Sequence, residues 1–192
     1  MKTQERVVFL VGKKVVLRPL NKETDLVATI RWVNDPEVTR YLNHTLPITE
    51  REECEWFDGI GKSAKSITLA IETKDDHKLI GSMGIHNIWW TSRVGTTGAL
   101  IGEKEYWGRG YGTDAKMILL NYAFNTLNLQ KICSTVIAFN KRSLHYSLHC
   151  GYKIEGRRPR HIFRNGRYHD LVELGLFKKD WLPFWKKYRS GD

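Results

Sequence analysis

A cluster of glycines in the middle of the chain places the strongest constraint on its fold. Residues 105–115 read EYWGRGYGTDA, with three glycines within five positions. The following residues, KMILLNYAFNTLN, carry apolar side chains at helical spacing, so a helix is predicted to begin near Tyr111. The first N–H groups of a helix lack partners within it, and glycine lets a ligand approach the backbone closely. The segment is therefore either a simple turn or a binding site for an anion.

The segments before this cluster show strand and helix patterns in turn. The periodicity of apolar residues predicts a bent strand or strand pair at residues 7–20, helices at 22–34 and 49–60, and strands at 67–72, 78–88 and 93–101. Pro36 is expected to end the first helix, because proline disfavours helical backbone in the residue before it. Thr49, with Glu52 three residues later, predicts a capping box at the start of the second helix.

The segments after the cluster continue this mixture. They predict a strand at residues 131–138, a helix at 141–149, strands at 152–163 and 168–177, and a short amphipathic helix at the end. Gly151 follows a helix where a left-handed cap is favoured, and Asn165-Gly166 predicts a hairpin turn. No repeat or linker interrupts the chain, so we expect one α/β (α+β) domain over residues 1–192, built on a mixed sheet.

The composition argues against membrane-spanning and disulfide-rich classes. Hydrophobic residues make up 41% of the chain, and no run of about 18 apolar residues occurs. Charges interrupt the apolar run near the N-terminus, so we expect residues 1–20 to form a folded strand region and not a signal peptide. The three cysteines have no C-x-x-C spacing, which favours a reducing cytoplasm.

The chain is basic, with 31 lysines and arginines against 21 aspartates and glutamates. The resulting net charge of +10 is compatible with binding of nucleic acid, binding of a polyanionic cofactor, or a solvated basic surface. No zinc-finger spacing, basic zipper or aromatic RNA-binding signature accompanies it. We expect most of these charges to be solvated surface.

Two motifs, each at a predicted strand–helix junction, narrow the prediction. Residues 107–112, WGRGYG, match the glycines of a Gln/Arg-x-x-Gly-x-Gly/Ala loop but carry tryptophan at its first position. Further along, Asn140 is followed by the small residue Ser143 and then by Gly151 and the aromatic Tyr152. Together with the order of elements over nearly the whole chain, these motifs resemble the GCN5-related N-acetyltransferase (GNAT) superfamily.

Finer features resemble one branch of that superfamily. The segments RWVNDPEVTRYL, IGEKEYWGRGYGTDA and FRNGRYHDLVELGL look like the branch that holds ribosomal-protein alanine acetyltransferases of the RimJ/RimL group and bacterial spermidine N-acetyltransferases. The resemblance implies a mostly antiparallel GNAT sheet with about four flanking helices, splayed between its fourth and fifth strands. It also implies transfer of an acetyl group from acetyl-CoA to a primary amine of a polyamine, a protein N-terminus or another small molecule, without a metal. No membrane partner is expected, and contact with nucleic acid is expected only through a ribosomal substrate. A homodimer is compatible with the resemblance.

The resemblance also assigns binding residues for acetyl-CoA. We call residues 107–113 the glycine loop, and its N–H groups, helped by Arg109, are expected to hold the pyrophosphate. Backbone groups of three residues are expected to pair with the pantetheine and polarise the thioester carbonyl. Asn140 and Ser143 are expected at the splay, although Asn140 is equally a preferred helix N-cap. The loop residues are Trp107, Gly108, Arg109, Gly110, Tyr111, Gly112 and Thr113, and the three backbone residues are Leu100, Ile101 and Gly102. Lys116, Lys141 and Arg142 are either contacts to the ribose phosphate or ordinary exposed helix residues.

The proton donor differs from that of many relatives. In them a tyrosine seven residues after the asparagine protonates the leaving thiolate, and this chain has Ser147 there. Ser143 and Tyr146 are the expected substitutes; Tyr146 lies about 100° around the helix from the usual position. If neither acts, a catalytically inactive module that binds acetyl-CoA, or a module associated with RNA or the ribosome, is the alternative function.

The proton acceptor is predicted less uniquely. The attacking amine must be neutral, so a nearby carboxylate or histidine is needed to take its proton. Glu103 is the first candidate, with Glu105 and His86 as further ones, and exposed charge is the other reading of the two glutamates. His145 and His149 share a helix face and suggest a metal alternative with Cys150, but no third ligand has recognisable spacing. Substrate choice is expected from the two early helices, whose Glu50, Glu52, Glu53 and Glu55 either attract a cation or favour their own helix dipole, and from residues 163–170.

Overall fold

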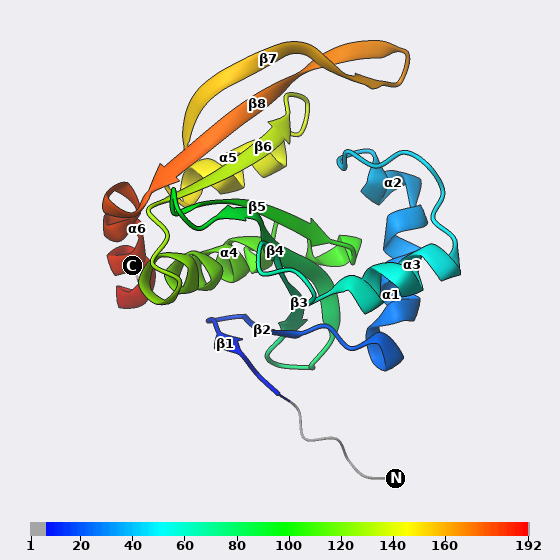
Figure 1. Cartoon of the computed structure of the whole chain (residues 1–192), viewed down its shortest axis with the longest axis horizontal. Helices are drawn as coiled ribbons and strands as arrows, with labels where there is room; N and C mark the ends of the chain where they lie inside the picture. Colours follow the sequence, from blue (N-terminus) through cyan, green and yellow to red (C-terminus); the bar gives the residue numbers. More distant parts are fainter. Residues whose placement is uncertain (1–6, 192) are drawn as a thin grey trace.

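A single eight-stranded sheet organises the computed structural model, which describes residues 7–191 (Figure 1). The strand order is β1-β2-β3-β4-β5-β6-β8-β7, and every neighbouring pair is antiparallel except the parallel pair β5–β6. The strands are β1 Leu10–Val11, β2 Val15–Pro19, β3 Ile67–Thr73, β4 Leu79–Trp89, β5 Val94–Ile101, β6 Lys131–Ile137, β7 Lys153–Arg164 and β8 Arg167–Phe177. The predicted mixed, mostly antiparallel sheet is confirmed.

The helices gather in two groups on either side of Figure 1, with α1, α2 and α3 apart from α4 and α6. They are α1 Lys22–Asn34, α2 Pro36–Thr39, α3 Glu50–Gly59, α4 Tyr111–Asn121, α5 Lys141–His149 and α6 Lys178–Ser190; a 3-10 turn at Lys104–Tyr106 precedes α4, and a π-helical turn at Tyr122–Thr126 continues it. Among residues 7–191, none of these helices has the length and apolar character needed to cross a bilayer.

The short helix α2 is absent from the sequence prediction. Pro36 does end α1, but it also occupies the first position of α2, where a missing N–H and a fixed φ are well tolerated. The Asp35 side chain caps the new helix by accepting a hydrogen bond from the Glu37 N–H at 2.8 Å. The bent strand or strand pair predicted at residues 7–20 is the pair β1 and β2. Residues 1–6 of the folded region expected at residues 1–20 lie outside the described part.

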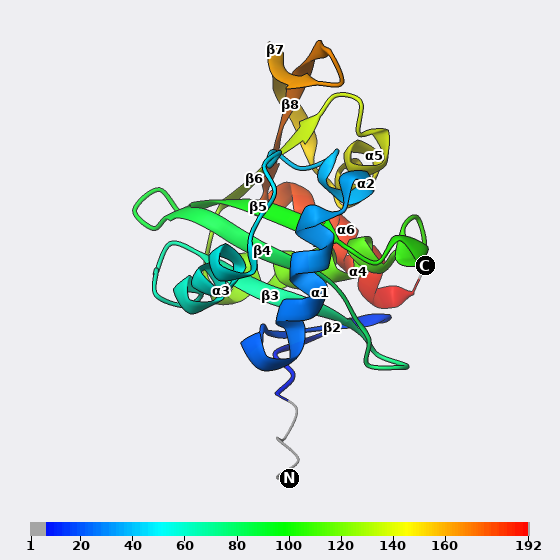
Figure 2. The ribbon, with the colours of Figure 1, turned by 90° about the vertical axis from the view of Figure 1, so that its right-hand side faces the viewer.

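Local signals at turns and caps are confirmed. Thr49 and Glu52 form the predicted capping box of α3. Gly151 has a φ of +99° after α5, and the Tyr152 N–H bonds the Ser147 carbonyl, as in a Schellman cap. Asn165 and Gly166 have φ values of +50° and +76°, the left-handed pair that joins β7 tightly to β8. The hairpin of β7 and β8 extends beyond the rest of the sheet (Figure 2).

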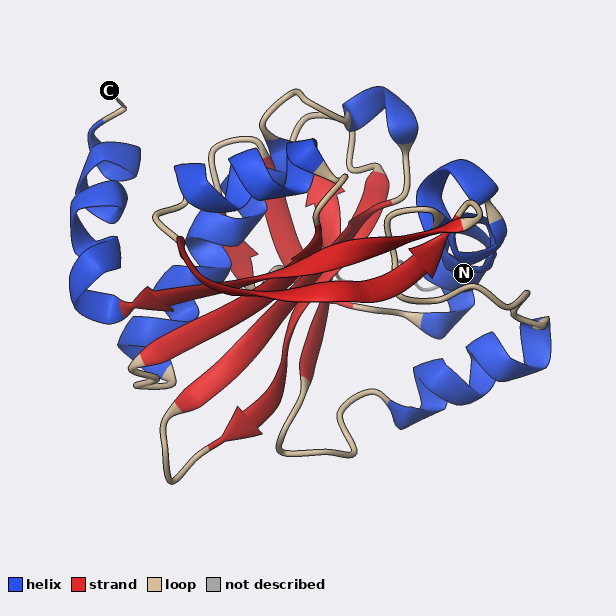
Figure 3. Cartoon of the chain, turned by 90° about the horizontal axis from the view of Figure 1, so that it is seen from above, coloured by secondary structure: helices blue, strands red, loops and turns tan. Residues whose placement is uncertain are grey.

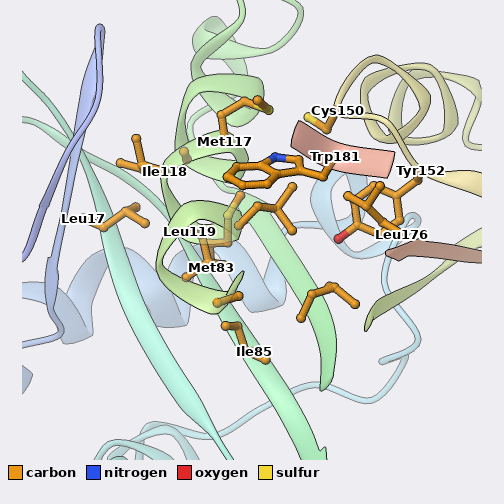
Figure 4. Close-up of a cluster of buried hydrophobic side chains, with 14 of the residues drawn as sticks. Leu17, Met83, Ile85, Met117, Ile118, Leu119, Cys150, Tyr152, Leu176 and Trp181 are labelled. Atoms are coloured by element: carbon orange, nitrogen blue, oxygen red, sulfur yellow. The ribbon is translucent and has the colours of Figure 1, made fainter. Parts of the chain in front are cut away.

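The main core lies between the sheet and α4. In Figure 4, Leu17, Met83 and Ile85 from the strands lie next to Ile118 and Leu119 of α4, in one buried cluster. Trp181 of α6 covers the same cluster and is fully buried. Each buried aliphatic side chain of this kind contributes about 2 kcal/mol to folding. The core therefore fixes α4, and with it the glycine loop at its start, against the sheet.

The sheet divides between β5 and β6. The two strands pair only at residues 94–96 and 131–133. Beyond that point β5 continues along β4, while β6 continues along β8. Seen from above, the strands fan apart from the middle of the sheet (Figure 3). This is the splay predicted between the fourth and fifth strands, because β1 and β2 together form the predicted first strand region.

Candidate active site

A cavity of about 1040 Å³ opens where β5 and β6 separate. Its walls are the unpaired edge of β5 from Thr97, the edge of β6 from Ser134, the glycine loop and one face of α5. Main-chain groups on such unpaired edges are free to bond an extended ligand. The volume is at the upper end of the range for small-molecule sites, so a cofactor-sized ligand fits.

The glycine loop forms one end of this cavity. Gly108 and Gly110 have φ values of +74° and +85°, which residues with a Cβ rarely adopt. Gly110 caps α4 without a side-chain hydrogen bond. Within residues 7–191, the N–H groups of Tyr111, Gly112 and Thr113 have no hydrogen-bond acceptor. The open end of α4 therefore suits an anion, which would interact with these donors and with the helix dipole.

Trp107 holds the glycine loop to the end of β5. Its indole Nε1–H donates to the Ile101 carbonyl at 2.7 Å. The Arg142 guanidinium lies 4.0 Å from the centre of the indole ring, and Tyr41 packs edge-on against it. Trp107, which stands where the family motif has glutamine or arginine, therefore packs against its neighbours. It also keeps Arg142 at the cavity wall. Arg142 fits a phosphate contact, whereas Lys141 is exposed and outside the lining.

Asp114 fixes the loop from behind. Its carboxylate accepts hydrogen bonds from the N–H groups of Lys13, Lys14 and Val15 at 2.8–3.0 Å and from the Tyr188 hydroxyl at 2.6 Å. Four donors stabilise this carboxylate and hold the first turn of α4 against the start of β2. Burial and this carboxylate raise the pKa of the Tyr188 hydroxyl.

Lys14 adds a positive charge beside the loop. Its Nζ donates to the Arg109 carbonyl at 2.8 Å. Arg109 itself is exposed and does not line the cavity. The sequence prediction missed Lys14, because no local pattern links residues that are 95 positions apart.

The three backbone residues predicted at the end of β5 do not share one role. Leu100 and Ile101 line the cavity. Gly102 does not, because its N–H donates to the Ile80 carbonyl at 2.9 Å. A Cβ at Gly102 would lie 2.0 Å from the Trp32 ring, so this glycine permits close packing and its N–H is not free for a ligand. The prediction for Gly102 therefore needs correction.

Asn140 and Ser143 occupy the start of α5. The Asn140 side chain accepts from the Ser143 N–H at 3.1 Å, which confirms its reading as an N-cap. Both residues also line the cavity. The N-cap role and a place in the ligand site are therefore compatible.

A cluster of polar side chains forms the inner end of the cavity. Lys116 donates from Nζ to the Thr97 hydroxyl oxygen at 2.8 Å, and the Tyr152 hydroxyl lies 2.8 Å from the same oxygen. The Lys116 ammonium lies 5.2 Å from the centre of the Tyr146 ring. Lys116, Thr97 and Tyr146 line the cavity. We call Thr97, Lys116, Tyr146 and Tyr152 the inner cluster.

The position of Lys116 contradicts both sequence readings of this residue. Lys116 is 1% exposed, so it is neither an ordinary surface lysine nor a contact to an outer phosphate. Its hydrogen bond to Thr97 of β5 shows that the side chain points to the sheet. Burial lowers the pKa of Lys116 to about 8, and burial raises the pKa values of the Tyr146 and Tyr152 hydroxyls. Ser147, at the usual tyrosine position, is buried outside the lining, and its hydroxyl has no partner within the described chain.

The predicted bases lie in different surroundings. The buried Glu103 accepts from the Arg31 guanidinium and from Trp32 Nε1, and it does not line the cavity. Glu105 pairs with Lys78 on the surface. His86 does line the cavity, with its Nδ1 2.8 Å from the Ser66 hydroxyl. Burial lowers the His86 pKa, so the imidazole is neutral near pH 7 and able to accept a proton.

The histidines of α5 do not gather further metal ligands. His145 and His149 both line the cavity, and Cys150 is buried behind them. Burial raises the pKa of the Cys150 thiol to about 12. Residues 7–191 contain no group of three or more histidine, cysteine or acidic side chains placed to hold a metal ion.

A smaller cavity of about 440 Å³ lies between α1, α3 and the sheet. Buried Glu53 lines it, and burial raises the pKa of that carboxyl. Leu100 lines both cavities, so they approach each other at β5. Glu52 forms the α3 capping box, whereas Glu50 and Glu55 are exposed. Of the four glutamates predicted to attract a cation, Glu53 is the buried one at this cavity.

Comparison with known proteins identifies the family. Residues 14–153, more than two thirds of the chain, match the model of the acetyltransferase (GNAT) domain. The chain belongs to this family. It is therefore an N-acetyltransferase, and its separated strands and glycine loop occupy the places that the resemblance predicted.

Curated relatives agree on acetyl transfer to nitrogen. An uncharacterized N-acetyltransferase, p20 of Bacillus licheniformis, is 26% identical and covers 90% of this chain and 97% of its own. The putative ribosomal N-acetyltransferase YdaF of Bacillus subtilis is 32% identical over 55% of this chain and 57% of its own. The spermidine N(1)-acetyltransferase of Escherichia coli is 30% identical over 43% of this chain and 45% of its own.

Solved structures show the same fold. The spermidine N-acetyltransferase of Vibrio cholerae, solved in complex with CoA and spermine, superposes with a TM-score of 0.80. It is 25% identical and covers 88% of this chain and 98% of its own. A GCN5-related N-acetyltransferase from Brucella melitensis superposes with a TM-score of 0.79 at 22% identity, over 97% of this chain and 86% of its own.

Proposed function

We propose that this protein transfers the acetyl group of acetyl-CoA to a primary amine, by direct attack of the amine on the thioester. The observation that carries the proposal is a cavity between two separated strands that ends at an uncapped helix N-terminus. That combination accepts an extended ligand with a phosphate group at one end. The CoA bound to the Vibrio cholerae relative supports the same donor.

Each wall of the cavity would bind a different part of acetyl-CoA. The N–H groups of Tyr111, Gly112 and Thr113 would hold the pyrophosphate, with Lys14 and Arg142 adding positive charge nearby. The free edge of β5 would pair with the amide groups of the pantetheine. The thioester would then lie near the splay, beside Thr97, where the inner cluster begins.

We propose that His86 accepts the proton that the attacking amine loses. His86 pairs with Thr96 across β4 and β5, so it lies on the opposite face of the sheet from the adjacent pair, Ile85 and Thr97. Thr97 bonds Lys116, which places His86 and α4 on opposite sides of β5. An amine that enters from the side of α1 and α3 would meet His86 before it reaches the thioester. The buried Glu103 is held by Arg31 and Trp32 and is a weaker candidate.

The acceptor is a polyamine or a protein N-terminal amine. Glu53 at the smaller cavity supports a cationic acceptor, because a buried carboxyl there gains from a positive charge. Both acceptor classes occur among the relatives, in the spermidine enzymes and in the putative ribosomal enzyme. We further propose that residues 1–192 act as one enzyme unit in the cytoplasm.

A thiol-release assay tests the proposal. The protein is given acetyl-CoA with spermidine, an amino sugar or a peptide bearing a free N-terminus, and the same peptide with a blocked N-terminus serves as the control. We expect free thiol to appear with at least one free amine and not with the blocked peptide. Binding of acetyl-CoA without thiol release for any amine would instead support an inactive binding module. Weak acetyl-CoA binding together with salt-sensitive RNA binding would contradict the proposed acetyltransferase activity.

A further inference from the structure

The inner cluster contains a cation whose burial the fold does not require. Lys116 is 1% exposed, and within residues 7–191 it takes part in no ion pair. Its ammonium contacts the Thr97 hydroxyl and the rings of Tyr146 and Tyr152. Burying a lysine without a carboxylate is costly, and an apolar residue would fill the same space at less cost. A buried ionisable side chain at a cavity wall is therefore a candidate functional residue.

We propose that Lys116 is the catalytic acid that protonates the leaving thiolate of CoA. This inference rests on the proposed acetyl transfer and deepens it. Lys116 lines the cavity at the splay, where Thr97 is the first β5 residue beyond the paired segment. The Thr97 hydroxyl accepts one Nζ proton and directs the ammonium to this point.

The step balances without another reagent. As the amine nitrogen bonds the carbonyl carbon, the carbon–sulfur bond breaks and its electron pair goes to sulfur. An Nζ–H proton of Lys116 moves to that sulfur, which leaves a neutral lysine and a free thiol. A protonated amine loses two protons, one before and one after it attacks, and both leave through His86 to solvent, whereas solvent returns one to Lys116. One proton is released overall for each protonated amine that is acetylated.

The acidities favour Lys116 over its neighbours. Burial lowers the Lys116 pKa to about 8, close to the ordinary thiol value of about 8.5. Efficient acid catalysis needs such a match between the donor and the group that it protonates. Burial raises the pKa values of the Tyr146 and Tyr152 hydroxyls, so both are weaker acids than an ordinary tyrosine. Cys150, which also faces Lys116, stays a neutral thiol with a pKa of about 12.

This chain lacks the tyrosine that protonates the thiolate in many relatives, so another residue must supply the proton. The position seven residues after Asn140 is Ser147, a small residue buried with an unpartnered hydroxyl. Ser147 therefore supplies no proton donor to the cavity. Lys116 approaches the same region from α4, on the other side of the separated strands from the amine's entrance.

A binding measurement tests Lys116 without relying on turnover. Calorimetry compares CoA with desulfo-CoA, which lacks the thiol, at pH 7, where Lys116 is protonated, for the wild type and Lys116→Met. In the wild type the ammonium donates a hydrogen bond to the CoA sulfur, so CoA should bind about tenfold more tightly than desulfo-CoA, a difference typical of one charged hydrogen bond. Lys116→Met should bind both equally. An unchanged preference in the variant would overturn the proposal.

The rates provide the second test. Below pH 8 we expect kcat of Lys116→Met to fall by about 100-fold, within the usual range for loss of a general acid. The ratio of wild-type to variant kcat should shrink toward one as pH rises past the Lys116 pKa, because the wild type then loses its proton too. Taking the ratio cancels the titration of His86 and of the amine. A ratio that stays constant with pH would assign Lys116 a purely structural role.

Two further variants separate charge from acidity. Lys116→Arg keeps the cation, but a guanidinium does not release a proton in this pH range, so it should not restore kcat. Lys131→Met is the matched control, because Lys131 is a half-buried lysine that pairs with Glu155 outside the cavity. Thermal unfolding checks that each variant is folded. If the wild type acetylates no amine, the proposed function fails, whereas the comparison of CoA with desulfo-CoA still decides the position of Lys116.

Discussion

The two ends of the cavity are built from different parts of the chain. At the outer end, exposed glycines and the free N–H groups of α4 form the glycine loop. At the inner end, the buried side chains of Thr97, Lys116 and Tyr152 are joined by hydrogen bonds, and the ring of Tyr146 packs beside the Lys116 ammonium. A backbone site gives charge complementarity with little desolvation, whereas a buried side-chain site gains chemical reactivity at a cost in stability. The outer end is therefore suited to binding and the inner end to chemistry.

The largest effect is expected for the support behind the outer end. Asp114→Ala removes the acceptor of three N–H groups and of the Tyr188 hydroxyl, all in a partly buried network. We expect the free energy of unfolding to fall by about 4 kcal/mol, as when one partner of a buried network is lost. Denaturant unfolding measures it. The control Asp180→Ala, which breaks a surface pair with Lys153, should cost about 1 kcal/mol or less. Equal losses would mean that Asp114 does not fix the loop.

A substitution at the inner end of the cavity should raise the free energy of unfolding, whereas Asp114→Ala should lower it. The Lys116 pKa is about 8 when folded and about 10.4 when unfolded, so its buried charge costs about 3 kcal/mol at pH 7. Lys116→Met should therefore raise the free energy of unfolding by an amount of that order. The difference should vanish as pH rises from about 8 to about 10.4, because the unfolded wild type then binds more protons than the folded one. Comparing wild type and variant cancels the titration of Tyr146, Tyr152 and Cys150. A destabilised variant would make Lys116 structural.

The outer end depends on a backbone conformation. Gly110 has a φ of +85°, so Gly110→Val should displace the N–H groups at the start of α4. We expect the Kd for acetyl-CoA to rise by about 100-fold, or about 2.7 kcal/mol. Gly166→Val, at a φ of +76° in the β7–β8 turn, is the matched control and should leave the Kd unchanged. An unaltered Kd in Gly110→Val would mean that the loop is only a turn.

The smallest effect concerns a carboxylate beside the cavity. Glu103→Gln keeps the shape of the side chain but weakens its bonds to Arg31 and Trp32. We expect about 1 kcal/mol of lost stability and a kcat within about twofold of the wild type. Steady-state kinetics of Glu103→Gln and His86→Gln shows which of the two residues accepts the proton of the amine. A large loss of kcat in Glu103→Gln alone would restore Glu103 as the predicted base.

The sequence predicted the elements better than their contacts. Strand and helix periods located every strand region and the helices other than α2, whose four residues are too few to show a period. The glycine loop and Asn140 were also predicted, because their roles depend on local backbone geometry. Lys14, Gly102 and Lys116 were missed or misread, because their contacts lie 19 or more positions away in the chain.

The sequence by itself determined the family, the order of elements and the position of the glycine loop at the start of a helix. These follow from local rules, since glycine permits a positive φ and a helix always begins with unpaired N–H groups. Only the tertiary structure decided which side chains meet inside the splay. The face of α4 that Lys116 occupies points to β5 because both are packed into one core, and no local pattern encodes that distance. The chemistry proposed for the inner end thus depends on packing, whereas the glycine loop at the outer end depends on local backbone geometry.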